Sequence, residues 1–519
     1  MSDTKDQPFI TDIGIAIAGS VDSGKSTFIG VITTGVLDDG NGKAREGVAK
    51  HPHEVASGKT SDISTRMFTV PGTRRAITMI DLCGHEKYLK TTTFGISGHY
   101  PDYAFVIVSA NRGILPMTKQ HFTLLMSLNI PIAIILTRAD LSPKDTYNDT
   151  KDSIEAYCSK AWNTKVNFVN DYYDTTETPE YGKKVGELVK ELMSPLNGRQ
   201  TFIPVITVSN KTGYFIDTVK GVLSSLEQRN FWDNFDYDAP EEFGKGDVPD
   251  MPLDKRSVCN NRIIRGFMTH MKNPSIFPPV EKFKGSIFYI DSVFNPRGIG
   301  LVISGIARGD MLKVGNIMHI GPIARKDPFE NELRIKSIHN NVKEPTGFLD
   351  HHHRGCLAVA PVTAKDMVTR DTIKRGMVLI SPKSLAKNVC FRFHAVITVF
   401  NHPATLKSGY CPNLHMGTIR QTVRMHLDPE KNGGKNEIKS NDYAIVTFKF
   451  KMNPEYVEPY QVFIFRSGAI HGIGVVIGIV SLDEDKDAKP DPVRYKRRFA
   501  HKRERAKNDR PVKGAAATS

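Results

Sequence analysis

Residues 13–26 read IGIAIAGSVDSGKS, a short apolar run that leads directly into a glycine-rich loop. The apolar, β-branched run predicts a buried strand, and the loop from Gly19 to Ser26 fits the phosphate-binding pattern GxxxxGKS. In such a loop the backbone N–H groups wrap around a phosphate, Lys25 can reach the β and γ oxygens, and the Ser26 hydroxyl suits Mg²⁺. The strand, the loop and the helix expected after it predict a nucleotide-binding α/β domain.

The rest of the first domain repeats this alternation of strand and helix. A helical periodicity runs through KQHFTLLMSL at 119–128, and apolar runs that predict buried strands lie on both sides of it. These runs are ITMIDL at 77–82, YAFVIVSA at 103–110, IPIAIIL at 130–136 and FIPVITVS at 202–209. The alternation predicts βαβ units, and hence a parallel sheet with helices on both faces and ligands at the carboxyl ends of the strands.

Three short motifs after these strands indicate which nucleotide binds. In DLCGH, Asp81 can hold the shell of a magnesium ion, and the backbone N–H of Gly84 can contact the γ-phosphate. In TRAD, the carboxylate of Asp140 can accept both N–H groups of a guanine edge, which adenine does not offer. SNKTG at 209–213 supplies a loop for backbone contact with the guanine carbonyl. The order of the motifs and their strand context predict GTP with Mg²⁺ rather than ATP.

With these motifs the chain resembles the translational GTPases of the elongation factor Tu and elongation factor one alpha superfamily, most closely the branch called GTP-binding proteins one and two. The resemblance covers about residues 13–482. Besides the phosphate loop, it is carried by SGKTSDIS at 57–64, DLCGHEKYLKTTTFGISGH at 81–99, TRAD at 137–140, SNK at 209–211, GIGLVISGIARGDMLKVGN at 298–316 and NHPATLKSGYCPNLH at 401–415. It implies an α/β P-loop GTPase domain followed by two all-β barrel domains. Short apolar runs bounded by turn residues after residue 261 also predict two barrels.

The resemblance assigns roles to individual residues. Thr60 would close over Mg²⁺ and the γ-phosphate as the first switch, and His85 would position the attacking water. Asp22 and Val21 match the family's metal-associated and hydrophobic-gate positions, and the metal ligands would be Ser26, Thr60 and Asp81. The residues expected at GTP are Gly19, Ser20, Val21, Asp22, Ser23, Gly24, Lys25, Ser26, Thr27, Asp81, Gly84, Thr137, Arg138, Asp140, Ser209, Asn210 and Lys211. Because phosphoryl transfer depends on orientation and charge stabilisation, an unstimulated enzyme is expected to be slow.

Around the nucleotide the sequence departs from the family pattern at four positions. Thr137 and Arg138 stand where the guanine motif normally has Asn and Lys, which predicts weaker nucleotide affinity, although an arginine can stack its planar head over a base. Lys59 replaces the apolar partner of the gate, so water access to His85 is expected to be controlled differently. Asn210 replaces the usual Ala, which a backbone contact tolerates.

Two cations indicate a cargo. Lys90 and Arg375 match the family's contacts with the 5′ end of tRNA, while a third contact, normally Asn, is Thr91 here. The resemblance therefore implies delivery of aminoacyl-tRNA to the ribosome, which would trigger hydrolysis. An alternative is a slow GTPase switch that recruits a protein partner, or a tRNA-like protein cargo, in ribosome rescue, mRNA surveillance or RNA decay. A metabolic GTPase like the large subunit of sulfate-activating enzymes shares the fold but matches fewer motifs.

Composition shifts along the chain predict its segments. They are a flexible N-terminus at 1–12, a GTP-binding domain at 13–227 with insertions near 37–59 and 147–198, an acidic linker or insertion at 228–261, β-barrels at 262–383 and 388–482, and a basic flexible tail at 483–519. Residues 494–513 of the tail carry ten Lys or Arg and two acidic residues, a balance that suits contact with RNA.

Composition also restricts the class of protein. The chain of 519 residues is too long for a single small module, and its formal charge of +14 favours a polyanionic partner. Its six cysteines form no CxxC pair, which favours a reducing compartment. The start MSDTKDQPFI is unlike a secretory signal, and no apolar run reaches the length of about 20 residues that spans a bilayer. We therefore expect a cytoplasmic monomer with no membrane partner.

Overall fold

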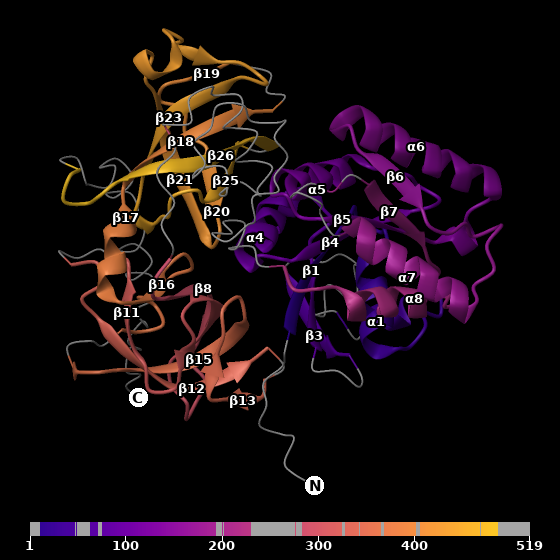
Figure 1. Ribbon diagram of the computed structural model, residues 1–519, viewed down its shortest axis with the longest axis horizontal. Coiled ribbons are helices and arrows are strands. Elements are labelled where there is room, and N and C mark those ends of the chain that lie inside the picture. The colour runs from indigo at the N-terminus through magenta and orange to yellow at the C-terminus, as the bar shows by residue number, and fades with distance from the viewer. Residues whose placement is uncertain are drawn as a thin grey trace, which may run out of the picture.

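The computed structural model describes residues 11–46, 48, 63–70, 75–193, 200, 202–229, 276, 283–323, 327–341, 343–364, 368–400, 405–467 and 469–485. An α/β domain lies beside two β-barrels, and the two barrels adjoin each other (Figure 1). The predicted fold class is therefore confirmed. The predicted N-terminus, the 228–261 linker and the 483–519 tail lie almost entirely outside the described residues.

The α/β domain contains a seven-stranded sheet. Its strands, in spatial order, are β2 (Ser64–Thr69), β3 (Arg75–Asp81), β1 (Thr11–Ala18), β4 (Tyr103–Ser109), β5 (Ile132–Thr137), β7 (Phe202–Thr207) and β6 (Lys165–Phe168). All neighbours are parallel except β2, which runs antiparallel to β3. The sequence analysis did not predict β2 and β6, which are partly exposed edge strands without a continuous apolar run. The stretch 147–198, suggested as an insertion, contributes β6 to this sheet.

Helices cover both faces of the sheet. They are α1 (Lys25–Thr34), α2 (Lys43–Glu46), α4 (Leu89–His99), α5 (Pro116–Ser127), α6 (Lys144–Trp162), α7 (Pro179–Met193) and α8 (Ile216–Ser225), with single 3₁₀ turns η2 (Glu86–Tyr88) and η3 (Ala139–Leu141). Along β1, Ile15 and Ile17 join the core beneath α1, α7 and α8, whereas Ala16 and Ala18 join the core beneath α4, α5 and α6. Because both faces are buried, the central strands read as continuous apolar runs.

The first barrel closes because β11 pairs with both β12 and β16. Its strands are β8 (Ser286–Phe294), β9 (Val302–Gly309), β11 (Ile317–Gly321), β12 (Glu332–Asn340), β15 (Arg354–Pro361) and β16 (Val378–Ser381), with β13 (Pro345–Thr346) added beside β12. A short pair, β10 (Leu312–Lys313) and β14 (Phe348–Leu349), adjoins them.

The second barrel is closed by six antiparallel strands. They are β18 (Arg392–Val399), β20 (Asn413–Met416), β21 (Ile419–Leu427), β23 (Tyr443–Phe450), β25 (Val462–Ser467) and β26 (Ala469–Val480). Short pairs and turns complete it: β17 (Val389–Cys390) with β24 (Glu455–Tyr456), β19 (Leu406–Lys407) with β22 (Glu437–Ile438), η6 (Lys383–Asn388) and η7 (Glu430–Asn432). Residues of this barrel, including Ile464 and Val475, join the core beneath α4 and α5.

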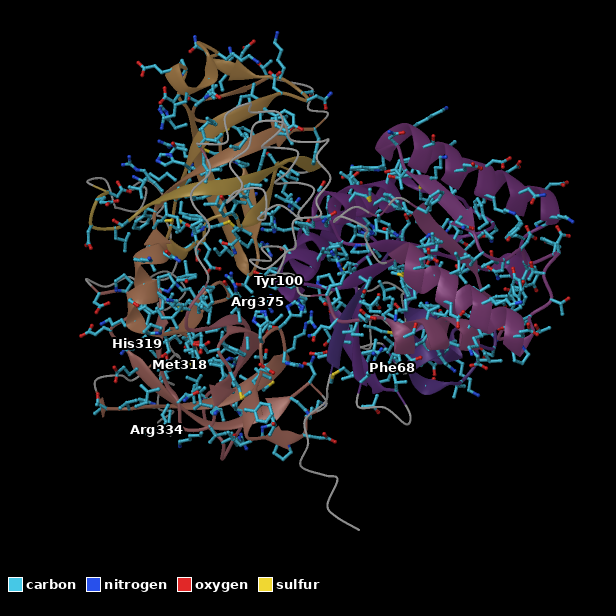
Figure 2. All side chains as sticks on the ribbon, in the orientation of Figure 1. Phe68, Tyr100, Met318, His319, Arg334 and Arg375 are labelled. Atoms are coloured by element: carbon cyan, nitrogen blue, oxygen red, sulfur yellow. The ribbon has the colours of Figure 1, made fainter. Side chains whose placement is uncertain are left out.

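All three domains meet at the C-terminal end of α4. Arg354 of the first barrel is buried and donates hydrogen bonds to the carbonyl oxygens of His99, at 2.7 and 3.2 Å, and Tyr100, at 2.7 Å. Tyr100 is buried against Gly417 of the second barrel, where an added Cβ would lie 1.9 Å from the Tyr100 hydroxyl. Figure 2 labels Tyr100 where the α/β domain faces the barrels. We call these contacts the α4 junction.

Charged groups hold the two barrels together beside this junction. Arg308 of the first barrel forms an ion pair with Glu458 of the second, and both side chains are largely buried. The Tyr289 hydroxyl donates to the same carboxylate at 2.5 Å, and its ring lies 6.1 Å from that of Tyr100. Among the described residues, no helix combines the length and the apolar character needed to cross a membrane.

Candidate nucleotide-binding site

The phosphate loop connects β1 to α1, as the sequence predicted. Gly19 has φ of 142° and Gly24 has φ of 90°, a region that favours glycine, and a Cβ on Gly19 would lie 2.4 Å from the Ile107 carbonyl oxygen. Lys25 is the first residue of α1, so the unsatisfied N–H groups of the first turn face the loop. The loop therefore has the backbone shape and the positive helix end that bind phosphate.

Lys25 and Gly84 meet at this loop. The Lys25 side chain is buried, and its Nζ donates to the Ser20 carbonyl oxygen at 2.7 Å. Burial lowers the pKa of Lys25, and Asp81 partly offsets this effect. A Cβ on Gly84 would lie 2.5 Å from Lys25 Nζ and 2.7 Å from the Val21 backbone nitrogen. The lysine, a backbone N–H and the glycine of DLCGH thus converge where a terminal phosphate would lie.

Ser26 and Asp81 provide oxygens for a metal ion. Ser26 Oγ donates to Asp81 Oδ2 at 2.7 Å, between the first turn of α1 and the end of β3. Hydroxyl and carboxylate oxygens beside a phosphate site are the donors that Mg²⁺ prefers, so these two residues fit the predicted metal. Thr60, the third expected ligand, and Lys59 lie outside the described residues.

His85 lies at the rim of the site. Its side chain is exposed, and Nδ1 accepts a hydrogen bond from the Lys87 backbone N–H at 3.2 Å, which caps η2. It lines a small pocket together with Val21, Asp22, Gly24, Lys25, Ser26, Thr27, Arg45, Gly84 and Arg138. The structure therefore brings most of the predicted phosphate residues, His85 and one guanine-loop residue to a single pocket.

We call the two loops predicted to contact guanine, 137–140 and 209–211, the guanine loops; they follow β5 and β7. The Thr137 hydroxyl is buried and lies 2.7 Å from the Ser23 carbonyl oxygen and 3.2 Å from that of Val108. Thr137 thus joins the first guanine loop to the phosphate loop. The presence of Thr in place of the family's Asn did not predict this contact. Arg138 has φ of 59° and precedes η3, which contains Asp140.

The second guanine loop is fixed by its own backbone and by the chain after α1. Ser209 is buried, and its hydroxyl accepts from the Thr212 N–H at 3.1 Å. The Asn210 carbonyl accepts from the Asp38 N–H at 2.9 Å, and a Cβ on Gly40 would lie 3.9 Å from Lys211 Nζ. Residues after α1 therefore run along this loop.

Two residues of α5 that the sequence analysis did not identify support the phosphate loop. His121 Nδ1 accepts from the Gly19 N–H at 2.9 Å, and Thr118 Oγ1 lies 2.8 Å from Ser20 Oγ. Burial, with a further contribution from Lys25, lowers the pKa of His121 to about 3, so its ring is neutral and can accept. A single histidine within an amphipathic helix pattern matches no motif, so the sequence did not identify His121.

Comparisons with known proteins find relatives of this chain. Residues 12–231 match the family described as "Elongation factor Tu GTP binding domain". The whole chain is 28% identical to GTP-binding protein 1 of Xenopus laevis, covering 98% of this chain and 69% of that protein. It is 28% identical to GTP-binding protein 2 of Mus musculus, covering 91% and 70%, and 26% identical to elongation factor 1-alpha of Pyrococcus furiosus, covering 88% and 93%.

Solved structures share the fold at lower identity. The bacterial selenocysteine-specific elongation factor EF-Sec superposes with a TM-score of 0.56 at 17% identity, and the match covers 90% of this chain but only 58% of that protein. The elongation factor SelB of Methanococcus maripaludis, in complex with the GTP analogue GppNHp, superposes with a TM-score of 0.55 at 16% identity and covers 93% and 80%.

Replacing Thr137 tests its link to the phosphate loop. Thr137→Val keeps the side-chain shape but removes the hydroxyl, leaving the buried Ser23 carbonyl without this donor. A lost buried partner costs about 1–3 kcal/mol, so we expect the Kd for GDP to rise about tenfold by fluorescence titration. Thr137→Ser should restore most of the affinity, and equal affinity of all three proteins would contradict the assignment.

The neutral state of His121 predicts a pH dependence of stability. An unfolded histidine titrates near its ordinary pKa of 6.5, whereas folded His121 has a pKa of about 3. Between these values the unfolded chain binds the extra proton, so this residue should destabilise the fold by about 1.4 kcal/mol per pH unit as pH falls below 6.5. When the pH is lowered from 7.5 to 5.5, the denaturation midpoint should fall less for His121→Gln than for the wild type. The same fall in both proteins would contradict this prediction.

Proposed function

We propose that the chain, whose residues 12–231 match the elongation factor Tu GTP binding domain, is a translational GTPase of the elongation factor Tu and elongation factor one alpha superfamily and delivers aminoacyl-tRNA to the ribosome in its GTP state. In this proposal it works as a cytoplasmic monomer, and the ribosome triggers hydrolysis.

The position of two cations carries the proposal. The Arg375 guanidinium, from the first barrel, lies 5.2 Å from the ring of Phe94 on α4. Lys90 is exposed one helical turn before Phe94, so it projects from the same side of α4. Figure 2 labels Arg375 next to Tyr100, at the border between the domains. Two cations from different domains, both suited to phosphate, thus lie along one helix that begins near the nucleotide site.

A cleft beside this helix supports the same interpretation. It extends from the phosphate loop and η2 to the N-terminal part of α5 and to β25 of the second barrel. Its lining includes the cations Lys87, Lys90, Arg112 and Arg466 and two acidic side chains, Asp22 and Glu86. This excess of cations suits a polyanionic partner such as the backbone of a nucleic acid.

The chemistry follows from the residues at the phosphate loop. Lys25, the loop N–H groups and the Gly84 N–H would stabilise charge on the phosphates as the γ-phosphoryl group leaves. Ser26 and Asp81, with Thr60, would hold Mg²⁺, which supplies charge neutralisation at the β- and γ-phosphates. His85 would orient the attacking water. Because its ring is exposed at the rim and caps η2, it must move inward before it can act, which favours slow hydrolysis until a partner moves it.

Asp140 would select guanine. Its carboxylate can accept from two N–H groups of guanine, whereas adenine presents no such pair, and the backbone of Ser209 to Lys211 would contact the guanine carbonyl. Thr137 keeps the base loop attached to the phosphate loop.

State-dependent binding of charged tRNA tests the proposal. The protein is loaded with GppNHp or with GDP and mixed with aminoacylated or deacylated tRNA, and retention on a filter is measured. We expect tight retention only for aminoacylated tRNA in the GppNHp state. Lys90→Ala and Arg375→Ala should each lower this affinity about tenfold and reduce its salt dependence, because each removes a phosphate contact. Lys160→Ala, on the exposed face of α6, is the matched control.

Two results would contradict delivery. Equal retention in the GDP state would mean that the nucleotide does not control the cargo. No retention of any tRNA, with GTP binding intact, would favour the alternative in which the switch recruits a protein partner in ribosome rescue, mRNA surveillance or RNA decay.

A further inference from the structure

The loop at 169–178, VNDYYDTTET, connects β6 to α7 beside both guanine loops. It belongs to the stretch that the sequence analysis suggested as an insertion, and the proposed function gives it no role. Its side chains nevertheless contact the segments that follow β5 and β7.

Two side chains hold the loop that follows β7 at both of its ends. Asn170 is buried, and its amide exchanges two hydrogen bonds of 2.8 Å with the backbone N–H and carbonyl of Thr207, the last residue of β7. At the other end, the Glu177 carboxylate accepts from the Phe215 N–H at 2.7 Å and from the Thr218 hydroxyl at 3.0 Å, at the start of α8. Ser209 to Lys211 lie between these two fixed points.

Aromatic contacts also hold the C-terminal end of the same loop. The Tyr214 hydroxyl lies 3.0 Å from the Asp171 carbonyl oxygen and 2.9 Å from that of Thr175, both in the 169–178 loop. The rings of Tyr172 and Tyr214 pack edge to face, with their centroids 5.1 Å apart. One neighbouring loop therefore holds the segment from 207 to 215 at Thr207 and again at Tyr214 and Phe215.

The 169–178 loop also reaches the segment after β5. The Tyr173 hydroxyl donates to the carbonyl oxygen of Ser142, two residues after Asp140. Asp174 pairs with Lys144 at 3.1 Å at the start of α6. Burial raises the pKa of Tyr172 and the nearby Asp140 carboxylate raises it further, which agrees with a position of this tyrosine close to the base-reading carboxylate.

Within the guanine motif TRAD, Thr137 bonds in a different direction. Thr137 stands where the family has Asn, and its hydroxyl contacts the carbonyls of Ser23 and Val108, on the phosphate side of the site. The backbone pairing of β5 with β7 joins the two segments up to the bond of 2.8 Å from the Val208 N–H to the Leu136 carbonyl, and beyond it the 169–178 loop bonds to both segments.

We propose that the 169–178 loop fixes the two guanine loops relative to each other, and that Asn170, Tyr173 and Glu177 are positioning residues for guanine binding. The inference rests on the proposed reading of guanine by Asp140. Because hydrogen bonds weaken steeply with misalignment, a displaced Asp140 loses its two bonds to guanine but only one to hypoxanthine, which lacks the 2-amino group.

The test compares the affinities of Tyr173 and Glu177 variants for GDP and for inosine diphosphate. Tyr173→Phe removes the bond to Ser142, beside Asp140, and should lower the preference for GDP over inosine diphosphate at least about threefold. Glu177→Ala releases the segment that contacts the base carbonyl, which both bases carry, and should raise the Kd for both diphosphates about tenfold. Glu177→Gln keeps one oxygen acceptor for the Phe215 N–H and should recover part of both. Glu180→Ala is the matched control, because that carboxylate is exposed on α7 and pairs with Lys184 on the same helix. Asn170→Ala is a second variant. Because Asn170 is buried, the melting temperature of this variant is measured as well, to check that it folds.

A variant of Asp140 separates this inference from its premise. Asp140→Asn exchanges an acceptor for an N–H donor and should shift preference toward xanthosine diphosphate, which carries an oxygen where guanine has its amino group. If that shift is absent, the guanine assignment fails and the inference fails with it. If the shift occurs but Tyr173→Phe keeps the wild-type preference for GDP over inosine diphosphate and Glu177→Ala keeps the wild-type affinities, the inference alone is overturned.

Discussion

The hydrogen bonds from Arg354 to the carbonyl oxygens of His99 and Tyr100 are the contact on which the arrangement of the domains depends. The last carbonyls of a helix have no partner within it, and a cation at this end is also favoured by the helix dipole. The first barrel therefore supplies the cap that α4 needs, and Tyr100, one residue further on, packs against the second barrel. One helix end thus attaches the α/β domain to both barrels.

The other end of α4 lies at the nucleotide site. Gly84 and His85 precede η2 and α4, and a helix of 11 residues extends about 16 Å from them to the α4 junction. Since a helix moves as a rigid element, a shift of Gly84 toward a terminal phosphate would change the position of Lys90 relative to Arg375. This link provides a physical reason why cargo affinity in our proposal depends on the nucleotide, without a further moving part.

The sequence predicts best the elements whose burial is complete. The strands containing Ile15, Ile80 and Ile135 are covered on both faces and read as continuous apolar runs, and the phosphate loop has a fixed pattern of glycine and lysine. Edge strands β2 and β6 have no such signal because one side of each faces solvent. His121, Asn170 and Glu177 act through hydrogen bonds to residues 37–102 positions away, so only the folded chain reveals them. Thr60 stays a prediction.

Hydrogen exchange of the whole protein, compared between its GppNHp and GDP states, tests the central claim that α4 connects the nucleotide to the barrels. We expect the exchange of amides to change at the start of α4 and also at the α4 junction, around Tyr100, Arg354 and Gly417, and the change at the junction should disappear in Arg354→Ala. Changes confined to residues 19–26 and 81–88, with the junction the same in both states, would contradict the account.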